Sequence, residues 1–286
     1  MTSITEINKC IQSSIRAEKT TLKKRDISEP KYTEALAIGL PRTLYNHPKF
    51  PSNIRFGGAF IHQSPLAKFA SVHKQMSCEL GDLLVFVRKK TIDGERFNAA
   101  LVQLKRTQSP TVSIKDDSAS KQLFLYENWP CFNVKQIGYQ YNIFPKVVTE
   151  GGVYGIIHEK SGSFSQIYIS EPMSSMHCDR DKTFGRFIAN IIDWEAGRTV
   201  SDEFNKDADE WSRLIWDIIR YVFHKTFKGR NTQFSGQSKS TIDFLQAMLK
   251  EPLAYEDNKD GKDESDSGFG ILFIDVDEQW ERPSEQ

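Results

Sequence analysis

The spacing of apolar residues changes along this chain, and the changes predict a mixture of helices and strands. Ile4, Ile7, Ile11 and Ile15 recur at helical spacing within residues 3–26. Residues 83–87 and 98–104 are instead short apolar runs, typical of buried strands. By the same criteria we expect further strands at residues 60–62, 153–158, 164–169 and 270–276. Further helices are expected at residues 32–38, 65–78, 118–128, 184–194, 208–227 and 241–249.

Local signals support one helix and two irregular segments. Ser64 is a suitable cap and Pro65 a suitable first-turn residue for the helix expected at residues 65–78. Residues 229–240 are predicted to form a flexible loop. Residues 256–267 carry six acids against two lysines, a composition typical of disorder. The apolar segment 270–276 is expected to pair with a sheet edge or a partner chain.

The order helix, strand, strand, helix, strand predicts an α/β layered core with a mixed central β-sheet flanked by helices, followed by a C-terminal helical region. We divide the chain into residues 1–58, an N-terminal helix and irregular segment, residues 59–182, the α/β core, and residues 183–286, a helical region with a final strand.

The two apolar runs at residues 83–87 and 98–104 form a predicted hairpin around Asp93-Gly94, a frequent hairpin-turn pair. A two-residue turn there places Asp82 opposite Lys105 and Leu84 opposite Gln103. Alternate residues of a strand share a face, and so do cross-strand partners. We therefore expect Asp82, Gln103 and Lys105 to converge on one face at the open end of the hairpin.

These side chains could form a metal site. The Asp82 carboxylate is a hard oxygen ligand for Mg²⁺ or Mn²⁺, Glu79 could add a second acid, and the Leu104 carbonyl a third oxygen. The Lys105 ammonium could hold an attacking water or stabilise charge on a phosphate. Taken as isolated residues, Asp82 and Lys105 are more readily interpreted as a surface ion pair at the mouth of the hairpin.

Gly81-Asp82, about twenty residues and then Gln103-Leu104-Lys105 on an apolar strand resemble the PD-(D/E)XK nuclease superfamily. Gln103 stands where the family often has Glu, a variant similar to that of some restriction enzymes and anti-phage nuclease effectors. The resemblance implies a restriction-endonuclease-like core, a strand between the first helix and the aspartate strand, and a helix after the lysine strand. This chain departs from that order, because the helix expected at residues 65–78 leaves little room for the strand unless it lies before the helix, near residues 59–62. It implies catalytic roles for Asp82, Gln103, Lys105 and Glu79, and a cation held by Asp82, Glu79 and the Leu104 carbonyl.

The net charge is formally zero, so any DNA-binding surface must be a local patch. Four basic residues of the hairpin could contact a DNA backbone: Arg88, Lys89, Lys90 and Arg106. The outer face of residues 208–227, with nearby basic residues, is a second candidate, weighed evenly against an ordinary solvated helix face. The group His177, Cys178, Asp179 and Asp181 is interpreted as a solvated loop rather than a metal site.

Four scattered cysteines indicate neither a zinc site nor a disulfide framework. The absence of an apolar N-terminal core and of a long apolar run predicts a cytoplasmic protein.

The predicted function is cleavage of DNA by a Mg²⁺-dependent endonuclease. Because the sequence has no nucleotide-binding loop or helicase motif, we expect control by partner subunits of a bacterial anti-phage defence or restriction complex. A homodimer would suit cleavage of both strands. The alternative is a catalytically inactive nuclease-fold module that binds nucleic acid or assembles a complex, which the neutral charge, Gln103 and the apolar last strand also suit.

Overall fold

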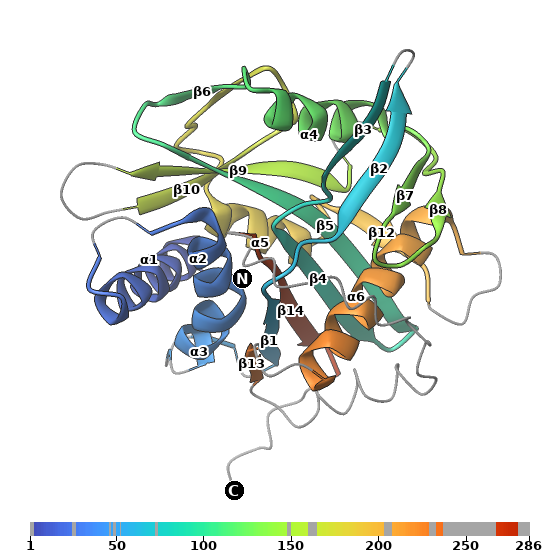
Figure 1. Cartoon of the computed structure of the whole chain (residues 1–286). Helices are drawn as coiled ribbons and strands as arrows, with labels where there is room; N and C mark the ends of the chain where they lie inside the picture. The colour runs from blue at the N-terminus through green and yellow to red at the C-terminus, as the bar shows by residue number, and fades with distance from the viewer. Residues whose placement is uncertain are drawn as a thin grey trace, which may run out of the picture.

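A computed structural model of the chain shows helices on both sides of a central sheet (Figure 1). It describes residues 3–24, 27–45, 47, 50–51, 53–71, 74–147, 150–159, 165–202, 208–228, 233–236 and 267–279. The helices are α1 (Ile4–Thr21), α2 (Glu29–Glu34), the π-helix η1 (Ala35–Gly39), α3 (Leu40–Tyr45), α4 (Asp117–Asn128), α5 (Phe184–Ile192) and α6 (Glu210–Lys228).

The strands fall into one large sheet and two small ones. The large sheet has the order β10-β9-β5-β4-β14-β1-β13, with β12 also pairing with β5. Its strands are β1 (Ile54–Ile61), β4 (Leu83–Thr91), β5 (Gly94–Thr107), β9 (Gly152–Glu159), β10 (Ser165–Ser170), β12 (Arg198–Val200), β13 (Gln233–Gly236) and β14 (Phe269–Asp277). The small sheets contain β2 (Leu66–Ser71), β3 (Lys74–Glu79), β7 (Phe132–Val134) and β8 (Gln140–Tyr141), and β6 (Thr111–Ser113) with β11 (Ser175–His177).

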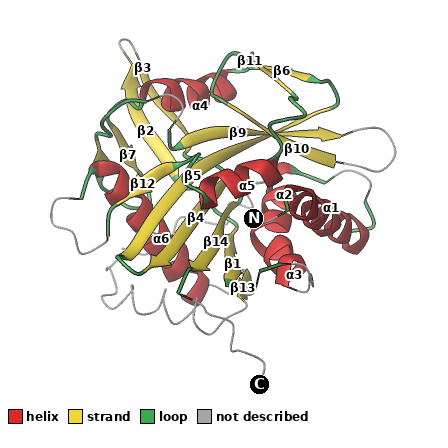
Figure 2. Cartoon of the chain, turned by 180° about the vertical axis from the view of Figure 1, so that it is seen from behind, coloured by secondary structure: helices red, strands yellow, loops and turns green. Residues whose placement is uncertain are grey.

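The central sheet is mixed and is covered on both faces. β4 and β5 are antiparallel, whereas β5 and β9 are parallel, as are β4 and β14. One hydrophobic core lies under α1, α2, η1, α3 and α5, and the other lies under α4, α6 and the four-stranded small sheet. Figure 2 shows the first group of helices in front of the sheet. The predicted α/β class with a mixed, helix-flanked sheet is confirmed.

Strand β5 shows why the apolar runs are continuous. Phe97, Ala99 and Leu101 belong to one core, while the alternating residues Ala100 and Val102 belong to the other. Both faces of the strand are therefore buried, and a strand buried on both faces needs apolar residues at every position.

The predicted helix at residues 65–78 is wrong, because this segment forms the hairpin β2–β3. Ala67 and Phe69 are buried, whereas Lys68 and Ala70 are exposed, so the burial period is two rather than 3.6. β2 pairs with β3 on one side and with β7 on the other. Pairing with a strand more than sixty residues away along the chain outweighs the local helical spacing.

The last predicted strand, at residues 270–276, is confirmed as β14, but not at a sheet edge. β14 lies inside the sheet, parallel to β4 and antiparallel to β1. Its Asp275 accepts hydrogen bonds from Arg88 Nε at 2.7 Å and Nη2 at 3.0 Å. This buried ion pair joins two register partners and, with the apolar flanks, fixes β14 next to β4.

The other predicted elements agree in part. The helices expected at residues 3–26, 118–128, 184–194 and 208–227 are confirmed as α1, α4, α5 and α6, and the strands at 153–158 and 164–169 as β9 and β10. Residues 233–236 of the predicted loop form β13 instead. The helix expected at residues 241–249 lies outside the described residues, and so does the disorder expected at 256–267, apart from residue 267. The three-part division stays a prediction; β1 crosses its first boundary.

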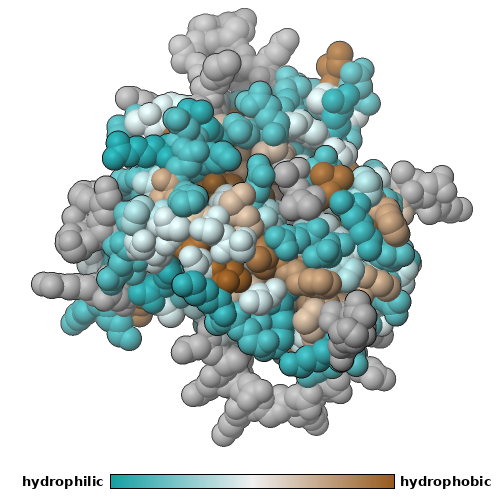
Figure 3. Space-filling view, turned by 90° about the horizontal axis from the view of Figure 1, so that it is seen from above, coloured by the Kyte–Doolittle hydropathy of each residue, from teal (hydrophilic) through white to brown (hydrophobic). Residues whose placement is uncertain are grey.

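Hydrophilic side chains dominate the described surface seen from above, and apolar side chains gather near the middle of that face (Figure 3). Among the described residues, no helix is both long enough and apolar enough to span a membrane.

Candidate functional site

Strand β5 extends beyond its neighbour β4, and the predicted site residues lie at this extension. The β4–β5 ladder begins at Leu83↔Val102, whereas the ladder to β9 continues from Leu101 to Thr107. Among the described residues, 103–107 of β5 therefore have no strand neighbour on the β4 side. The chain leading into β4, and the N-terminal end of α2, approach this edge instead.

Asp82 is bound to the part of that edge that has no strand partner. Its backbone N–H donates to the Val102 carbonyl at 3.0 Å. Its Oδ2 accepts a hydrogen bond from the Leu104 N–H at 2.6 Å and another from Gln103 Nε2. Asp82 is 6 % exposed and Gln103 1 % exposed. A buried carboxylate is thus held against the strand by one backbone and one side-chain donor.

The predicted hairpin register is wrong by two residues. Thr91 pairs with Gly94, which leaves Ile92 and Asp93 in the loop and pairs Leu84 with Leu101 rather than with Gln103. Asp82 consequently lies beside Gln103 instead of Lys105. Because side chains alternate with a period of two, a two-residue shift leaves each of them on its predicted face.

A second carboxylate, from Glu29 at the start of α2, binds the same edge. Its Oε1 accepts a hydrogen bond from the Arg106 N–H at 3.0 Å. Backbone groups of alternate residues in a strand point to the same side, so the N–H groups of Leu104 and Arg106 lie roughly 7 Å apart on one edge. The Leu104 carbonyl points to the same side, between them. Two carboxylates therefore flank one backbone carbonyl.

Glu29 is not among the site residues predicted from the sequence. It lies more than fifty residues before Asp82, in a segment interpreted as largely irregular, and no local spacing links the two. The Ser28-Glu29-Pro30 start of a helix was a visible signal for local structure, but not for this contact.

The pKa values of two acids at this edge, Asp82 and Glu79, are raised by burial and by neighbouring negative charges. Burial raises the pKa of Asp82 well above its usual value, and the negative charges of Glu79 and Glu29 add to the effect. Burial also raises the pKa of Glu79, and Glu29 adds to that shift. The Lys105 charge acts in the opposite direction on both carboxyl groups. Glu79, at the end of β3, thus acts on Asp82 electrostatically, through its negative charge.

Lys105 is half-buried and forms no hydrogen bond or ion pair with any residue that the structure describes. Its ammonium group lowers the pKa of both Asp82 and Glu79, so it lies within electrostatic reach of them. Most buried or half-buried charges in proteins have a partner. A cation near two acids but bonded to neither of them is available to an anionic ligand.

Several buried polar atoms near Asp82 lack a partner among the described residues. They are Gln103 Oε1, Gln122 Oε1 and the Tyr154 hydroxyl. Tyr154 is the register partner of Gln103, and Tyr126, one helical turn after Gln122 on α4, donates to the Leu80 carbonyl at 2.8 Å. Buried polar atoms without protein partners are usually satisfied by water or an ion.

The donor set fits a hard cation. Among the described residues, no three His, Cys, Asp or Glu side chains are gathered closely enough to hold a metal ion by themselves. Mg²⁺, however, is usually held by one or two carboxylates, completed by water and substrate phosphates. Asp82, Glu29, the Leu104 carbonyl and Gln103 Oε1 supply only oxygen atoms, as Mg²⁺ or Mn²⁺ requires.

The basic residues predicted to contact DNA do not form one patch. Arg88 is 4 % exposed and bonded to Asp275, and Lys89 pairs with Glu278 at 2.6 Å. Arg88, Lys89 and Lys90 lie roughly 20–26 Å along β4 from Asp82, at about 3.3 Å per residue. Only Arg106 is near the site, and it pairs with Glu159. We correct the prediction accordingly: the buried Arg88 is not available to a phosphate.

The basic face expected on α6 is also partly engaged. Arg213 Nη1 donates to the Tyr139 hydroxyl at 2.7 Å, and the guanidinium lies over the Tyr139 ring. Arg220 pairs with Asp217 at 3.0 Å.

Comparisons of the chain with protein-family models, with curated proteins and with solved structures found no match. We therefore infer a function from the geometry of the β5 edge.

Proposed function

We propose that this protein is a Mg²⁺-dependent endonuclease that cleaves phosphodiester bonds of DNA. The observation that carries the proposal is the pair of carboxylates, Asp82 and Glu29, bound to alternate N–H groups of β5 on either side of the Leu104 carbonyl. Lys105, unpaired among the described residues, lies within electrostatic reach.

The order of elements supports a restriction-endonuclease-like core. The first helices precede β1, which precedes the aspartate strand β4 and the Gln-x-Lys strand β5. α4 follows β5 and leads by way of two short strands to β9, which is parallel to β5. Resemblance to the PD-(D/E)XK nucleases implies a strand between the first helix and the aspartate strand, and a helix after the lysine strand. β1 and α4 occupy those places.

Each residue has a distinct role in this proposal. Asp82, Glu29 and the Leu104 carbonyl hold the cation, and Glu79 adds negative charge. A bound Mg²⁺ or Mn²⁺ lowers the pKa of water and neutralises phosphate charge. Gln103 holds the Asp82 carboxylate and presents its own oxygen, and Lys105 stabilises the negative charge that develops on the phosphate.

The biological setting is proposed from the sequence. A nuclease without a nucleotide-binding loop needs a trigger from elsewhere, so we propose a subunit of a bacterial anti-phage defence or restriction complex that acts with partner proteins. Pairwise cutting of duplex DNA would favour a homodimer.

A second candidate function has one specific observation in its favour. Asp82 is almost fully buried, and its carboxylate already accepts two hydrogen bonds. A nuclease fold kept for binding nucleic acid or assembling a complex would have no need of an open site. In that case the substitution Asp82→Ala would change neither DNA binding nor cleavage.

The test is conversion of supercoiled plasmid to open circles by the purified protein, alone and with the products of neighbouring genes. We expect nicking in Mg²⁺ or Mn²⁺ and none in EDTA. Glu29→Gln keeps an acceptor for the Arg106 N–H but loses the charge, so the half-saturating Mg²⁺ concentration should rise about 10-fold or more. The matched control Glu278→Gln, just after β14 and beside the far end of β4, should cut like wild type. No cleavage in any metal would contradict the proposal.

A further inference from the structure

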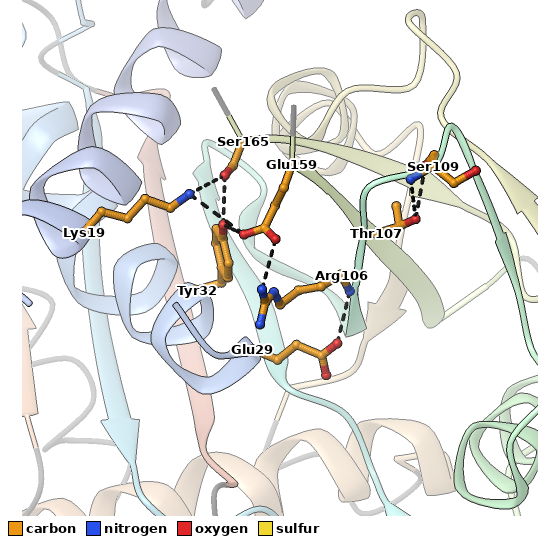
Figure 4. Close-up of polar contacts among 8 residues, drawn as sticks. All are labelled: Lys19, Glu29, Tyr32, Arg106, Thr107, Ser109, Glu159 and Ser165. Atoms are coloured by element: carbon orange, nitrogen blue, oxygen red, sulfur yellow. Dashed lines mark hydrogen bonds and ion pairs between the residues drawn. The ribbon is translucent and has the colours of Figure 1, made fainter. Parts of the chain in front are cut away.

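A polar cluster, consisting of Lys19, Tyr32, Arg106, Glu159 and Ser165, lies next to the β5 edge (Figure 4). The Glu159 carboxylate is its centre. It accepts a hydrogen bond from the Tyr32 hydroxyl and one from Arg106 Nη2 at 3.0 Å. Lys19 Nζ lies 3.8 Å from the same carboxylate and donates to Ser165 Oγ at 2.9 Å. Helices α1 and α2 are thereby joined to β5, β9 and β10.

The polar cluster and the proposed cation site have two features in common: both use helix α2, and both use Arg106 of β5. Glu29 and Tyr32 are three residues apart on α2, so they lie on neighbouring positions of one helix face. Arg106 also serves twice: its N–H donates to Glu29, and its guanidinium donates to Glu159. Figure 4 shows both contacts. The hydrogen bonds therefore form a closed ring, from Glu29 on α2 through Arg106 and Glu159 to Tyr32, which also lies on α2.

The hydrogen bond between Tyr32 and Glu159 is strengthened by burial and by the charge of the carboxylate. The Tyr32 residue is fully buried, and the Glu159 side chain is 9 % exposed. Burial raises the pKa of Tyr32, and the hydrogen bond to Glu159 raises it further, so the hydroxyl stays a neutral donor at physiological pH. Hydrogen bonds between an ionised group and a buried donor are shorter and stronger than neutral ones.

We propose that Tyr32 and Glu159 are positioning residues that hold the Glu29 carboxylate at the β5 edge and thereby set the affinity for the divalent cation. This inference rests on the proposed function. α2 opens a helical stretch that continues without a break through η1 and α3 to Tyr45, and Glu29 lies at its N-terminal end, where helices fray. One hydrogen bond from Arg106 fixes Glu29 to β5. The Tyr32–Glu159 bond adds a second attachment, one turn further along, that fixes the orientation of this helix end.

Mn²⁺ binding, measured by electron paramagnetic resonance without DNA, tests the inference together with Mg²⁺ titrations of plasmid nicking. Tyr32→Phe should weaken Mn²⁺ binding about 10-fold and raise the half-saturating Mg²⁺ concentration equally, as for other residues that orient metal ligands. The nicking rate at saturating Mg²⁺ should stay within about twofold. Glu159→Ala should act in the same direction. Tyr141→Phe is the matched control, because the buried Tyr141 hydroxyl also donates to a carboxylate, that of Asp217 at 2.8 Å.

A double-mutant cycle separates positioning from a general structural role. Because Tyr32 acts through Glu29, Tyr32→Phe should cause no further loss of Mn²⁺ affinity in the Glu29→Gln background. Additive losses, or wild-type Mn²⁺ affinity in Tyr32→Phe alongside weakened binding in Glu29→Gln, would overturn the positioning role and leave the proposed function standing. A wild-type protein that neither binds Mn²⁺ nor cuts DNA would overturn the proposed function itself.

Discussion

Replacement of Asp82 by asparagine is expected to abolish metal-dependent cleavage and to stabilise the fold at neutral pH. The amide can still accept the Leu104 N–H, but it carries no charge for a cation, so nicking should fall at least about 100-fold. The folded protein raises the pKa of Asp82, through burial and the charges of Glu79 and Glu29. When the pKa of an acid is higher in the folded state than in the unfolded state, the folded protein loses stability as the pH rises above the pKa of that acid in the unfolded state, about 3.9 for Asp.

The pH dependence makes this result specific. At pH 8 we expect a gain of about 1–2 kcal/mol in the free energy of unfolding for Asp82→Asn, which corresponds to a few degrees in Tm. The gain should shrink as the pH falls toward 4, because wild-type Asp82 is then protonated. Thermal unfolding at pH 8 and pH 5 measures it, with Asp93→Asn in the exposed turn as the control. A variant that is less stable at both pH values, and still active, would contradict the assignment.

Lys105→Ala is expected to abolish cleavage of plasmid DNA in Mg²⁺ while leaving the fold intact. The Lys105 ammonium bonds to no described residue, so its removal breaks no hydrogen bond or ion pair with these residues, and Tm should change little. The same removal takes away the cation that offsets the negative charges around Asp82 and Glu79, and the one proposed to stabilise the phosphate. A loss of about 100-fold or more in nicking rate is the scale for a single charge-stabilising group.

The control for this variant is Lys90→Ala, at the far end of β4. Circular dichroism and thermal unfolding establish that both variants are folded, and nicking is measured at saturating Mg²⁺ and DNA. Full cutting by a folded Lys105→Ala protein would rule out the assigned role.

The hairpin shows how far the sequence carries the prediction. Both strands, their partner faces and the turn region follow from apolar runs around Asp93-Gly94, but the register does not. A two-residue turn centred on Asp-Gly needs positive φ at both residues, and here Gly94 has φ 123° while Asp93 does not belong to the positive-φ residues. Thr91 instead stabilises a loop of Ile92 and Asp93, by accepting from the Asp93 N–H at 3.2 Å and donating to the Gly94 carbonyl at 3.0 Å.

The parts that sequence reasoning missed are contacts between distant segments. Glu29 reaches the site through a hydrogen bond across 77 positions, and β14 enters the sheet beside β4 from nearly two hundred residues away. Neither contact leaves a periodic signal. The misassigned helix at residues 65–78 has the same cause, since Phe69 fits a helical stripe as well as it fits the strand that pairs with Phe132.

The acids at the β5 edge are expected to lower the free energy of unfolding of the protein. Burial and neighbouring acids raise the pKa values of Asp82 and Glu79, and two buried amide oxygens lack partners among the described residues. Such local conflicts are typical of functional sites, where a ligand completes what the fold leaves unsatisfied.

The most direct measurement is the anomalous signal of Mn²⁺ in a crystal of the protein with bound DNA. We predict a peak at the open edge of β5, coordinated by the carboxylates of Asp82 and Glu29 and by the Leu104 carbonyl. A crystal at millimolar Mn²⁺ with no peak at this edge, or with the ion held by other residues, would contradict the account.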